Sequence, residues 1–367
     1  MAPIKAAVIG YGMSAKIFHL PFLQALPDQF QVYGIVQRTP KAGDDARQDY
    51  PKLKHWNSAD DMIKDSEVEL VVVTSIPDAH FEQTKRALES GKHVLCEKPL
   101  VATAKEALEL DQIAKKHNRI LTVYQNRRWD SDFLTLRKLI DEGTLGRLVE
   151  IDTRFDRWRV DPPTASAATW KFKQGVASGA IYDLGVHLLD QLVVLFGMPA
   201  RVTALLVNHR QYTEKGTGGE TGGDSFICHL HYDSIGLTAT AKTSVASLHT
   251  EQMRYWVRGD KGSYIKYNTD TQEDQLKAGA KISDTDFGVD KSIGVLTTLG
   301  TTGKPEKNSV SADSPPVTYL EFYKLLYAAL IGKGENPVTA EQAAKVLKII
   351  ELAKQSSDEG RTVKVDI

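Results

Sequence analysis

Short apolar runs alternate with helical patterns over the first 124 residues of the chain. The runs 4–9 and 70–73 are almost entirely apolar, as in strands that are buried on both faces of a sheet. Thr103 and Glu106 form a capping box, which predicts where the last helix of this region begins. We expect strands at 4–9, 30–36, 70–73, 93–96 and 120–124, and helices at about 15–25, 81–90 and 103–117. Strands that alternate with helices imply right-handed crossovers and a doubly wound parallel sheet.

From about residue 125, polar and apolar positions alternate with period two. This pattern is typical of an antiparallel sheet with one packed face. We expect strands at 148–155, 201–207, 226–231, 236–241 and 253–257, helices at 131–141, 178–197, 319–331 and 339–356, and surface loops at 213–223 and 300–316. The change of pattern divides the chain into an α/β domain, residues 1–124, and a second α+β domain, residues 125–367.

Charge and cysteine content exclude several classes of protein. The chain of 367 residues has 46 Lys and Arg against 47 Asp and Glu, so it lacks the basic excess expected of a nucleic-acid or membrane-surface binder. Its apolar runs are far too short for a membrane span. Cys96 and Cys228 are far apart and show no metal-ligand spacing. We expect no disulfide, no metal site and a reducing, cytoplasmic location.

A glycine-rich turn follows the first strand and opens a helix. It reads Gly10, Tyr11, Gly12, Met13, Ser14 and Ala15. The first glycine permits a tight turn, the second lets the main chain approach a pyrophosphate, and Ala15 allows close packing of helix on strand. Free N–H groups at the helix N-terminus favour the phosphates. The context therefore predicts a dinucleotide-binding site rather than a plain glycine turn.

The end of the second strand bears on which dinucleotide binds. An NAD enzyme usually carries an acidic residue about twenty residues past the glycines, for the ribose hydroxyls. Here residues 36–39 contain no acid, and Arg38 can pair with a 2′-phosphate through its forked charge. We therefore expect NADP rather than NAD, against the alternative that Arg38 is an ordinary surface residue.

Two further segments follow strands at the same edge of the predicted sheet. Ser75 to His80 follows one strand, and His80 heads the next helix, where a structural role is more common than a catalytic one. Glu97, Lys98 and Pro99 follow another. The proline keeps Lys98 out of the helical conformation, so its side chain is held at the edge where ligands of parallel sheets bind. A lysine there can donate a hydrogen bond to a reacting oxygen, or it can simply be solvated.

Asp183 and His187 lie four residues apart in a predicted helix, and so on one face of it. Histidine is the usual proton-transfer group near neutral pH, and Asp183 could fix its tautomer or bind a substrate hydroxyl. Gly185 between them costs helix stability of about 1 kcal/mol relative to alanine, which suggests a close approach of packing atoms or a ligand. Alternatively, the pair is only a polar helix face.

Together these motifs resemble the glucose-fructose oxidoreductase / inositol dehydrogenase / rhizopine catabolism (Gfo/Idh/MocA) family over nearly the whole chain. The residues that carry the resemblance are the turn 10–15, Glu97-Lys98-Pro99 after Gly91-Lys92-His93, and Asp183 with His187. Residues 18–21 (Phe-His-Leu-Pro) and Asn126-Arg127-Arg128 are similar to a subgroup that contains NADP-dependent scyllo-inositol dehydrogenases. Ile76-Pro77 and Trp170-Lys171 depart from the usual family residues.

The resemblance implies hydride transfer between NADP(H) and the alcohol or ketone carbon of a sugar or inositol-like polyol. Lys98, Asp183 and His187 would be the catalytic residues, meeting in an interdomain cleft. Cofactor contacts would come from residues 10–15, Arg38, Ser75, Pro77, His80, Glu97, Lys98, Asn126, Trp170 and Lys171. Substrate contacts would come from Lys98, Arg127, Trp158, Tyr182, Asp183 and His187, with Arg159 and Trp170 as further candidates to line the pocket.

The family leaves two alternatives open. One is a regulator that binds dinucleotide without catalysis, which the presence of both Lys98 and His187 argues against. The other is an enzyme of a different ring substrate, a dihydrodiol or a bilin. The resemblance also implies a homodimer or homotetramer formed through the sheet of the second domain.

Overall fold

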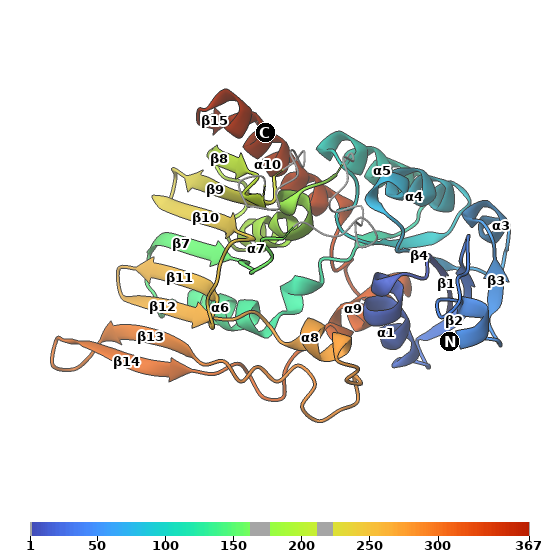
Figure 1. Cartoon of the computed structure of the whole chain (residues 1–367), viewed down its shortest axis with the longest axis horizontal. Coiled ribbons are helices and arrows are strands. Elements are labelled where there is room, and N and C mark those ends of the chain that lie inside the picture. The colour runs from blue at the N-terminus through green and yellow to red at the C-terminus, as the bar shows by residue number, and fades with distance from the viewer. Residues whose placement is uncertain (1, 162–176, 211–222, 367) are drawn as a thin grey trace. The chain divides into compact units, whose positions relative to one another are not determined.

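The computed structural model describes residues 2–161, 177–210 and 223–366 (Figure 1). The described chain forms two compact units. Unit 1 comprises residues 1–126, 273–287 and 318–344, and unit 2 comprises residues 127–272, 288–317 and 345–367. The first boundary lies close to the one predicted from the change of pattern, but two later segments return to unit 1.

Unit 1 is built on a six-stranded sheet in the order β3-β2-β1-β4-β5-β6, with every pair parallel. The strands are β1 (Ile4–Ile9), β2 (Phe30–Val36), β3 (Lys54–Trp56), β4 (Leu70–Val73), β5 (His93–Cys96) and β6 (Leu121–Val123). The order reverses at β1, which confirms the predicted doubly wound sheet. All four side chains of β4 are buried, as its unbroken apolar run predicts.

Helices pack on the sheet of unit 1 in two groups. α3 (Ala59–Ile63), α4 (His80–Glu89) and α5 (Ala104–Lys116) lie together, and Figure 1 shows α4 and α5 side by side. α1 (Leu20–Gln24) contacts β2 and packs on α9 (Leu320–Leu330). α5 begins with the predicted capping box, in which Thr103 and Glu106 each satisfy a main-chain N–H of the other.

The returning segments complete the core of unit 1. They carry α8 (Gln272–Lys277), whose first residue belongs to unit 2, α9, and the start of α10 (Ala340–Glu359). Tyr323 of α9 stacks on Phe22 with ring centroids 5.5 Å apart, and Phe322 lies edge-on to Tyr124 at 5.1 Å. Thr122 of β6 also donates to the Val338 carbonyl at 3.1 Å. Aromatic burial thus recruits residues distant in sequence into the first domain.

Unit 2 is built on a nine-stranded sheet in the order β14-β13-β12-β11-β7-β10-β9-β8-β15. The strands are β7 (Leu148–Arg154), β8 (Arg201–Val207), β9 (Ser225–Tyr232), β10 (Leu237–Thr243), β11 (Met253–Gly259), β12 (Gly262–Tyr267), β13 (Gly294–Leu299), β14 (Pro305–Val310) and β15 (Val363–Lys364). Among the described strands of this sheet, only β10 and β7 pair in parallel, so the sheet is mostly antiparallel, as predicted.

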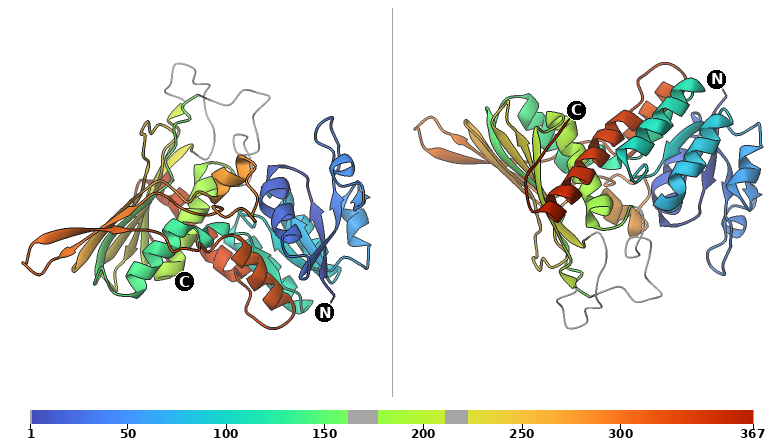
Figure 2. Two further views of the ribbon diagram at one scale, coloured as in Figure 1. Left: turned by 90° about the horizontal axis from the view of Figure 1, so that it is seen from below. Right: turned by 90° about the horizontal axis from the view of Figure 1, so that it is seen from above.

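Helices cover one face of this sheet. In both views of Figure 2, α6 (Ser131–Asp141) and α7 (Val186–Phe196) lie on the same face, and the opposite face carries no helix of the described chain. β9 shows the expected alternation: Cys228, Leu230 and Tyr232 are buried, whereas Ile227 and His229 are only half-buried. We call the uncovered side the outer face; its half-buried side chains include Ile227, His229, Trp256 and Ile265, and Leu205 is exposed there.

Several expectations differ from the structure, and one falls on residues that are not described. Strands β3, β12, β13 and β15 were not expected, and the helix expected at about 15–25 consists of a π-turn, η1 (Ala15–His19), followed by α1. Residues 305–310, expected within a loop, form the edge strand β14, whose residues are almost all exposed. The helix expected over 178–197 begins as a π-turn, η5 (Ile181–Gly185), before α7. Nearly all of the surface loop expected at 213–223 lies outside the described residues.

Candidate active site

The glycine turn lies between β1 and a helix that opens with a π-turn, η1 (Ala15–His19). Gly10 has φ +100°, and a Cβ there would lie 2.9 Å from the Thr74 hydroxyl and 3.2 Å from its carbonyl oxygen. Only glycine therefore fits where β1 and β4 leave the sheet. A Cβ on Gly12 would meet nothing within 4 Å, and Ala15 is fully buried. Open space at Gly12 beside a helix N-terminus fits the pyrophosphate of a dinucleotide.

The turn is tied to the segment that follows β2. Tyr11 donates a hydrogen bond to the Asp49 carboxylate at 2.5 Å, and Lys16 pairs with Asp44 at 2.6 Å. The Lys16 ammonium also lies 4.2 Å from the centre of the Tyr11 ring. These contacts hold the segment 38–49 against the turn, where the far end of a dinucleotide would reach.

Arg38 is exposed at the carboxyl end of β2, at the start of this segment. Its neighbour Gln37 fixes the segment from the other side: its amide donates to the Asp44 carbonyl at 2.7 Å and accepts from the Ala46 N–H at 2.8 Å. Arg38 is therefore an exposed cation on a loop that Gln37 holds in place.

Glu97 connects several parts of unit 1. It is buried at the end of β5, and its Oε1 accepts hydrogen bonds from the Ser14 hydroxyl and from His19 Nε2, the latter at 3.2 Å. Burial acts to raise the pKa of Glu97, but hydrogen bonds from His19 and Ser14 and the charge of Lys98 together lower it to about 2. Glu97 is thus a carboxylate at neutral pH.

Lys98 is half-buried directly after Glu97, at the edge where β4 and β5 end. Its main-chain N–H donates to Glu97 Oε2 at 2.9 Å, and its peptide bond to Pro99 is cis. Since Glu97 also binds Ser14, one carboxylate connects the glycine turn to the main chain of Lys98. The sequence predicted these three residues for one site, and the structure brings them together.

His80 joins two loops at this edge. It is buried at the start of α4, with Nδ1 2.9 Å from the Pro99 carbonyl and Nε2 3.0 Å from the Ser75 carbonyl. Pro77 is buried beside it, and the Ser75 hydroxyl donates to Gln83 at 2.7 Å. His80 therefore supports the loops that carry Ser75 and Lys98. Direct contact of Ser75, Pro77 or His80 with a cofactor stays a prediction.

In unit 2, Asp183 lies in η5 and His187 in the first turn of α7. Asp183 is half-buried and His187 is buried. A Cβ on Gly185 would lie 2.9 Å from the Phe226 ring and 3.0 Å from Ile181. The glycine is thus explained by close packing of the helix on β9, the first of the two reasons that its position suggested.

The other residues predicted to contact cofactor or substrate differ in burial and in their partners. Arg127 is buried in unit 2, paired with Asp130 at 3.0 Å, and its guanidinium lies 4.7 Å from the Phe155 ring centre. Asn126 is buried at the end of unit 1. Tyr182 is buried, and Trp158 is half-exposed. Trp170 and Lys171 lie outside the described residues.

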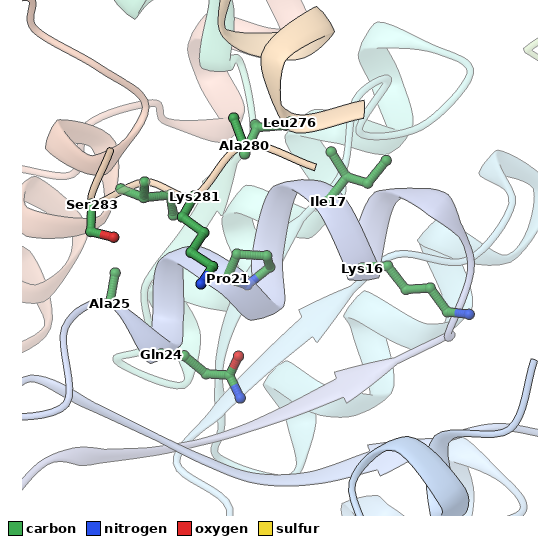
Figure 3. A pocket seen from close by; sticks show the side chains of 10 residues that line it. Lys16, Ile17, Pro21, Gln24, Ala25, Leu276, Ala280, Lys281 and Ser283 are labelled. Carbon is green, nitrogen blue, oxygen red and sulfur yellow. The ribbon is translucent and has the colours of Figure 1, made fainter. Parts of the chain in front are cut away.

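A separate cavity of about 470 Å³ lies in unit 1, on the side of α1 that faces residues 276–283 (Figure 3). Its lining residues are Lys16, Ile17, Pro21, Gln24, Ala25, Leu276, Ala280, Lys281, Ile282 and Ser283. No sequence-predicted site residue is among them, so this cavity is not part of the candidate active site.

Within the described residues, no cluster of three or more His, Cys, Asp or Glu is placed to hold a metal ion. The same part of the chain has no helix both long and apolar enough to cross a membrane.

Comparison with known proteins decides the family. A model described as "Oxidoreductase family, NAD-binding Rossmann fold" matches residues 4–125, and one described as "Oxidoreductase family, C-terminal alpha/beta domain" matches residues 137–365. The chain belongs to the Gfo/Idh/MocA oxidoreductase family. This confirms the resemblance inferred from the motifs, and the Rossmann match supports a nicotinamide dinucleotide as cofactor.

Several members of the family are similar over their full length. An uncharacterized oxidoreductase of Schizosaccharomyces pombe, C26H5.09c, is 40% identical and covers 99% of both chains. The scyllo-inositol 2-dehydrogenase (NADP(+)) IolW of Bacillus subtilis is 36% identical over 99% of this chain and 96% of its own. The structure of the putative oxidoreductase yvaA of Bacillus subtilis superimposes with a TM-score of 0.88 at 34% identity, covering 99% of both chains.

Within this family fold, sequence reasoning missed the residues that support the motifs. His19 and Tyr323 lie beneath Glu97, Gln37 orders the loop of Arg38, and Thr74 closes on Gly10. Residues 18–21 are similar to a subgroup signature, but the local pattern gives His19 no role. The contact of His19 with Tyr323 depends on the packing of α9, which has no local signal in the sequence.

Proposed function

We propose that the chain is an NADP(H)-dependent oxidoreductase that transfers a hydride to or from the secondary alcohol or ketone carbon of a sugar or cyclic polyol. The observation that carries the proposal is the single carboxylate, Glu97, that joins Ser14 of the dinucleotide turn to the main chain of Lys98. The substrate class rests on the names of relatives, which include IolW, a D-glucoside 3-dehydrogenase and a 1,5-anhydro-D-fructose reductase.

The nicotinamide supplies or accepts the hydride when the dinucleotide is bound. In this proposal the Lys98 ammonium donates a hydrogen bond to the reacting oxygen and stabilises the negative charge that develops there. His187 takes the hydroxyl proton during oxidation and returns it during reduction. Asp183 orients His187 and the substrate. Lys98 belongs to unit 1 and His187 to unit 2, so the proposal requires both units to act on one substrate.

Substitution of Lys98 and of His187 tests the proposed reaction. We expect Lys98→Met to lower kcat by about 10²- to 10³-fold and His187→Ala by about 10²- to 10⁴-fold, because each removes a group that acts mainly in the transition state. Initial rates would be measured with NADP and NADPH against inositols, aldoses and sugar ketones. Lys85→Met and His249→Ala, at an exposed or partly exposed side chain of each unit, serve as matched controls.

Wild-type turnover in both Lys98→Met and His187→Ala, with unchanged NADPH affinity, would overturn the mechanism. No turnover by the wild-type chain with any member of the panel would count against the substrate class and favour the non-catalytic regulator instead.

The choice of NADP over NAD rests on Arg38, an exposed cation on the ordered loop after β2. We expect Arg38→Ala to raise KM for NADP by about tenfold or more while leaving KM for NAD nearly unchanged, since only NADP offers a 2′-phosphate to pair. Arg86→Ala on α4, which removes an exposed cation of the same unit, should change neither value. Equal wild-type efficiency with both cofactors would refute the role of Arg38.

We also propose that the chain forms a homodimer or homotetramer through the outer face of the nine-stranded sheet. The support is chemical: exposed Leu205 and half-buried Ile227 are cross-strand neighbours there, and Trp256 pairs with Ile265. Apolar side chains on an uncovered sheet face are typical of an association surface.

A further inference from the structure

His19 lies at the centre of a buried polar cluster in unit 1. The cluster consists of Ser14, His19, Glu97, Tyr124 and Tyr323, contributed by the glycine turn, η1, the end of β5, the end of β6 and α9. His19 is completely buried, and its ring lies 4.5 Å from the centre of the Tyr124 ring. Its nitrogens face two partners: Nε2 lies 3.2 Å from Glu97 Oε1, and Nδ1 lies 2.9 Å from the Tyr323 hydroxyl.

The hydrogen-bond partners of Tyr323 indicate which nitrogens of His19 carry protons. The Phe18 carbonyl oxygen can only accept, and it lies 2.7 Å from the Tyr323 hydroxyl and 3.1 Å from the Tyr124 hydroxyl. At 2.7 Å the single hydroxyl proton of Tyr323 lies on its bond to Phe18, so the Tyr323 oxygen accepts from His19 Nδ1–H. On the other side, the Glu97 carboxylate can only accept from Nε2–H. Both ring nitrogens thus carry a proton, and His19 is an imidazolium paired with a buried carboxylate.

The carboxylate of Glu97 also accepts hydrogen bonds from two residues of the candidate site. Its Oε1 also accepts from the Ser14 hydroxyl, and its Oε2 accepts from the Lys98 main chain at 2.9 Å. Burying a lone carboxylate would be costly, so the cationic ring is what allows Glu97 to stay ionised beneath the site. Charge-assisted hydrogen bonds of this kind are short and directional, and they hold their partners in one arrangement.

We propose that His19 is a positioning residue of the reaction: as an imidazolium held by Tyr323, it fixes the carboxylate that connects Ser14 of the dinucleotide turn to Lys98. This inference rests on the proposed function for its kinetic consequence but not for its charge state. It gives a role to the segment 18–21, which the catalytic assignment leaves unused. His19 touches neither substrate nor reacting atoms in this proposal.

Ring ¹⁵N resonances of the full-length protein, labelled at histidine, test the charge state without any substrate. We expect both nitrogens of His19 to show protonated shifts at pH 7. Two histidines of the same unit are internal references. His80 has a carbonyl at each nitrogen, whereas His93 accepts from the Ile120 N–H at 3.0 Å through Nδ1, which is therefore unprotonated. Tyr323→Phe identifies the His19 signals, because it removes the acceptor of Nδ1–H while keeping the ring.

Kinetics of His19→Gln and Tyr323→Phe test the positioning role. We expect kcat to fall by about 10- to 100-fold while the sugar KM changes by less than about threefold, because misplacing Lys98 harms the transition state more than binding. His93→Gln, at the opposite end of β5, is the matched control and should retain wild-type kcat.

The outcomes separate the two proposals. An unprotonated Nδ1 or Nε2 in His19 at pH 7, or wild-type kcat in a folded His19→Gln protein, overturns the inference about His19. Failure of the wild-type chain to turn over any sugar or polyol overturns the proposed function alone, since the resonances of His19 still report its charge. Should His19→Gln not fold, Tyr323→Phe and the wild-type spectrum decide.

Discussion

At the scale of single residues, His80 makes the fold of the site sensitive to pH. Burial acts to lower the pKa of His80, but the Cys96 sulfur and hydrogen bonds to the Pro99 and Ser75 carbonyls raise it to about 9. Folding therefore favours the protonated ring. Its stabilisation is complete below about pH 6.5, the unfolded value, and is lost as the pH rises through 9.

We predict that His80→Gln destabilises the protein by up to about 3 kcal/mol at pH 6.5 and by progressively less toward pH 9.5. Thermal midpoints of wild type and variant across this range provide the measurement, with His55→Gln as a control at a half-buried histidine that bonds one carbonyl. A difference in midpoint that stays constant from pH 6.5 to 9.5 would show that His80 contributes packing alone.

The sequence indicates Lys98 and Glu97 as candidate site residues, because both follow a recognisable strand and precede a proline. It could not predict what makes Glu97 a carboxylate. His19 and Tyr323 are 304 positions apart, and no local pattern indicates that α9 packs against the glycine-turn helix. Short sequence motifs identify candidate site residues such as Lys98. The groups that determine the charge of Glu97 are brought to it by tertiary packing, which these motifs do not predict.

At the scale of elements, two of the helices that carry predicted site residues contain a π-turn, η1 before α1 and η5 before α7. Such turns are rare and are frequent at functional sites, because the extra residue in the turn redirects side chains. The helical periodicity of the sequence predicts the helices but not their π-turns. The same periodicity predicts Asp183 and His187 on a single α-helix, whereas Asp183 lies in the π-turn η5.

Gly185 at the end of η5 allows a packing prediction. Alanine favours helix by about 1 kcal/mol, but its Cβ would lie 2.9 Å from the Phe226 ring, so we expect Gly185→Ala to destabilise by about 1–3 kcal/mol overall. Chemical denaturation of the full chain measures this change. In a Phe226→Leu background the contact with the ring is removed and the 3.0 Å contact with Ile181 remains, so the same substitution should destabilise the protein less. Equal destabilisation in both backgrounds would locate the cost elsewhere.

Strand prediction succeeded where burial imposes a pattern. Strands β1, β2, β4, β5 and β8 begin and end at the predicted residues, since each has an apolar face or two. β14 was missed because its sequence, Pro-Glu-Lys-Asn-Ser-Val, is polar and opens with proline. Both features are tolerated only at a sheet edge, and β14 is indeed the edge strand.

At the scale of the whole molecule, the outer face of the nine-stranded sheet determines assembly in our proposal. We predict that Leu205→Glu combined with Trp256→Glu shifts the protein to monomers, because two buried charges without partners would oppose association. Light scattering coupled to size-exclusion chromatography gives the mass. Leu108→Glu, at an exposed leucine of α5 in unit 1, is the matched control and should leave the mass unchanged. A wild-type monomer, or an unchanged oligomer in the double variant, would rule out this face.

The interrupted course of unit 1 along the chain has a practical consequence for protein engineering. Residues 1–124 look like a self-contained module, yet their core is closed by Tyr323 and Phe322 of α9 and by the strand-like pairing of Thr122 with Thr339. A chimera that exchanges only the first 124 residues between relatives would graft a glycine turn without the tyrosine that orients His19. Transfer of cofactor preference should therefore succeed only when α9 is exchanged together with the turn. The transferable unit is defined by contacts in space, and three separate segments of the gene encode it.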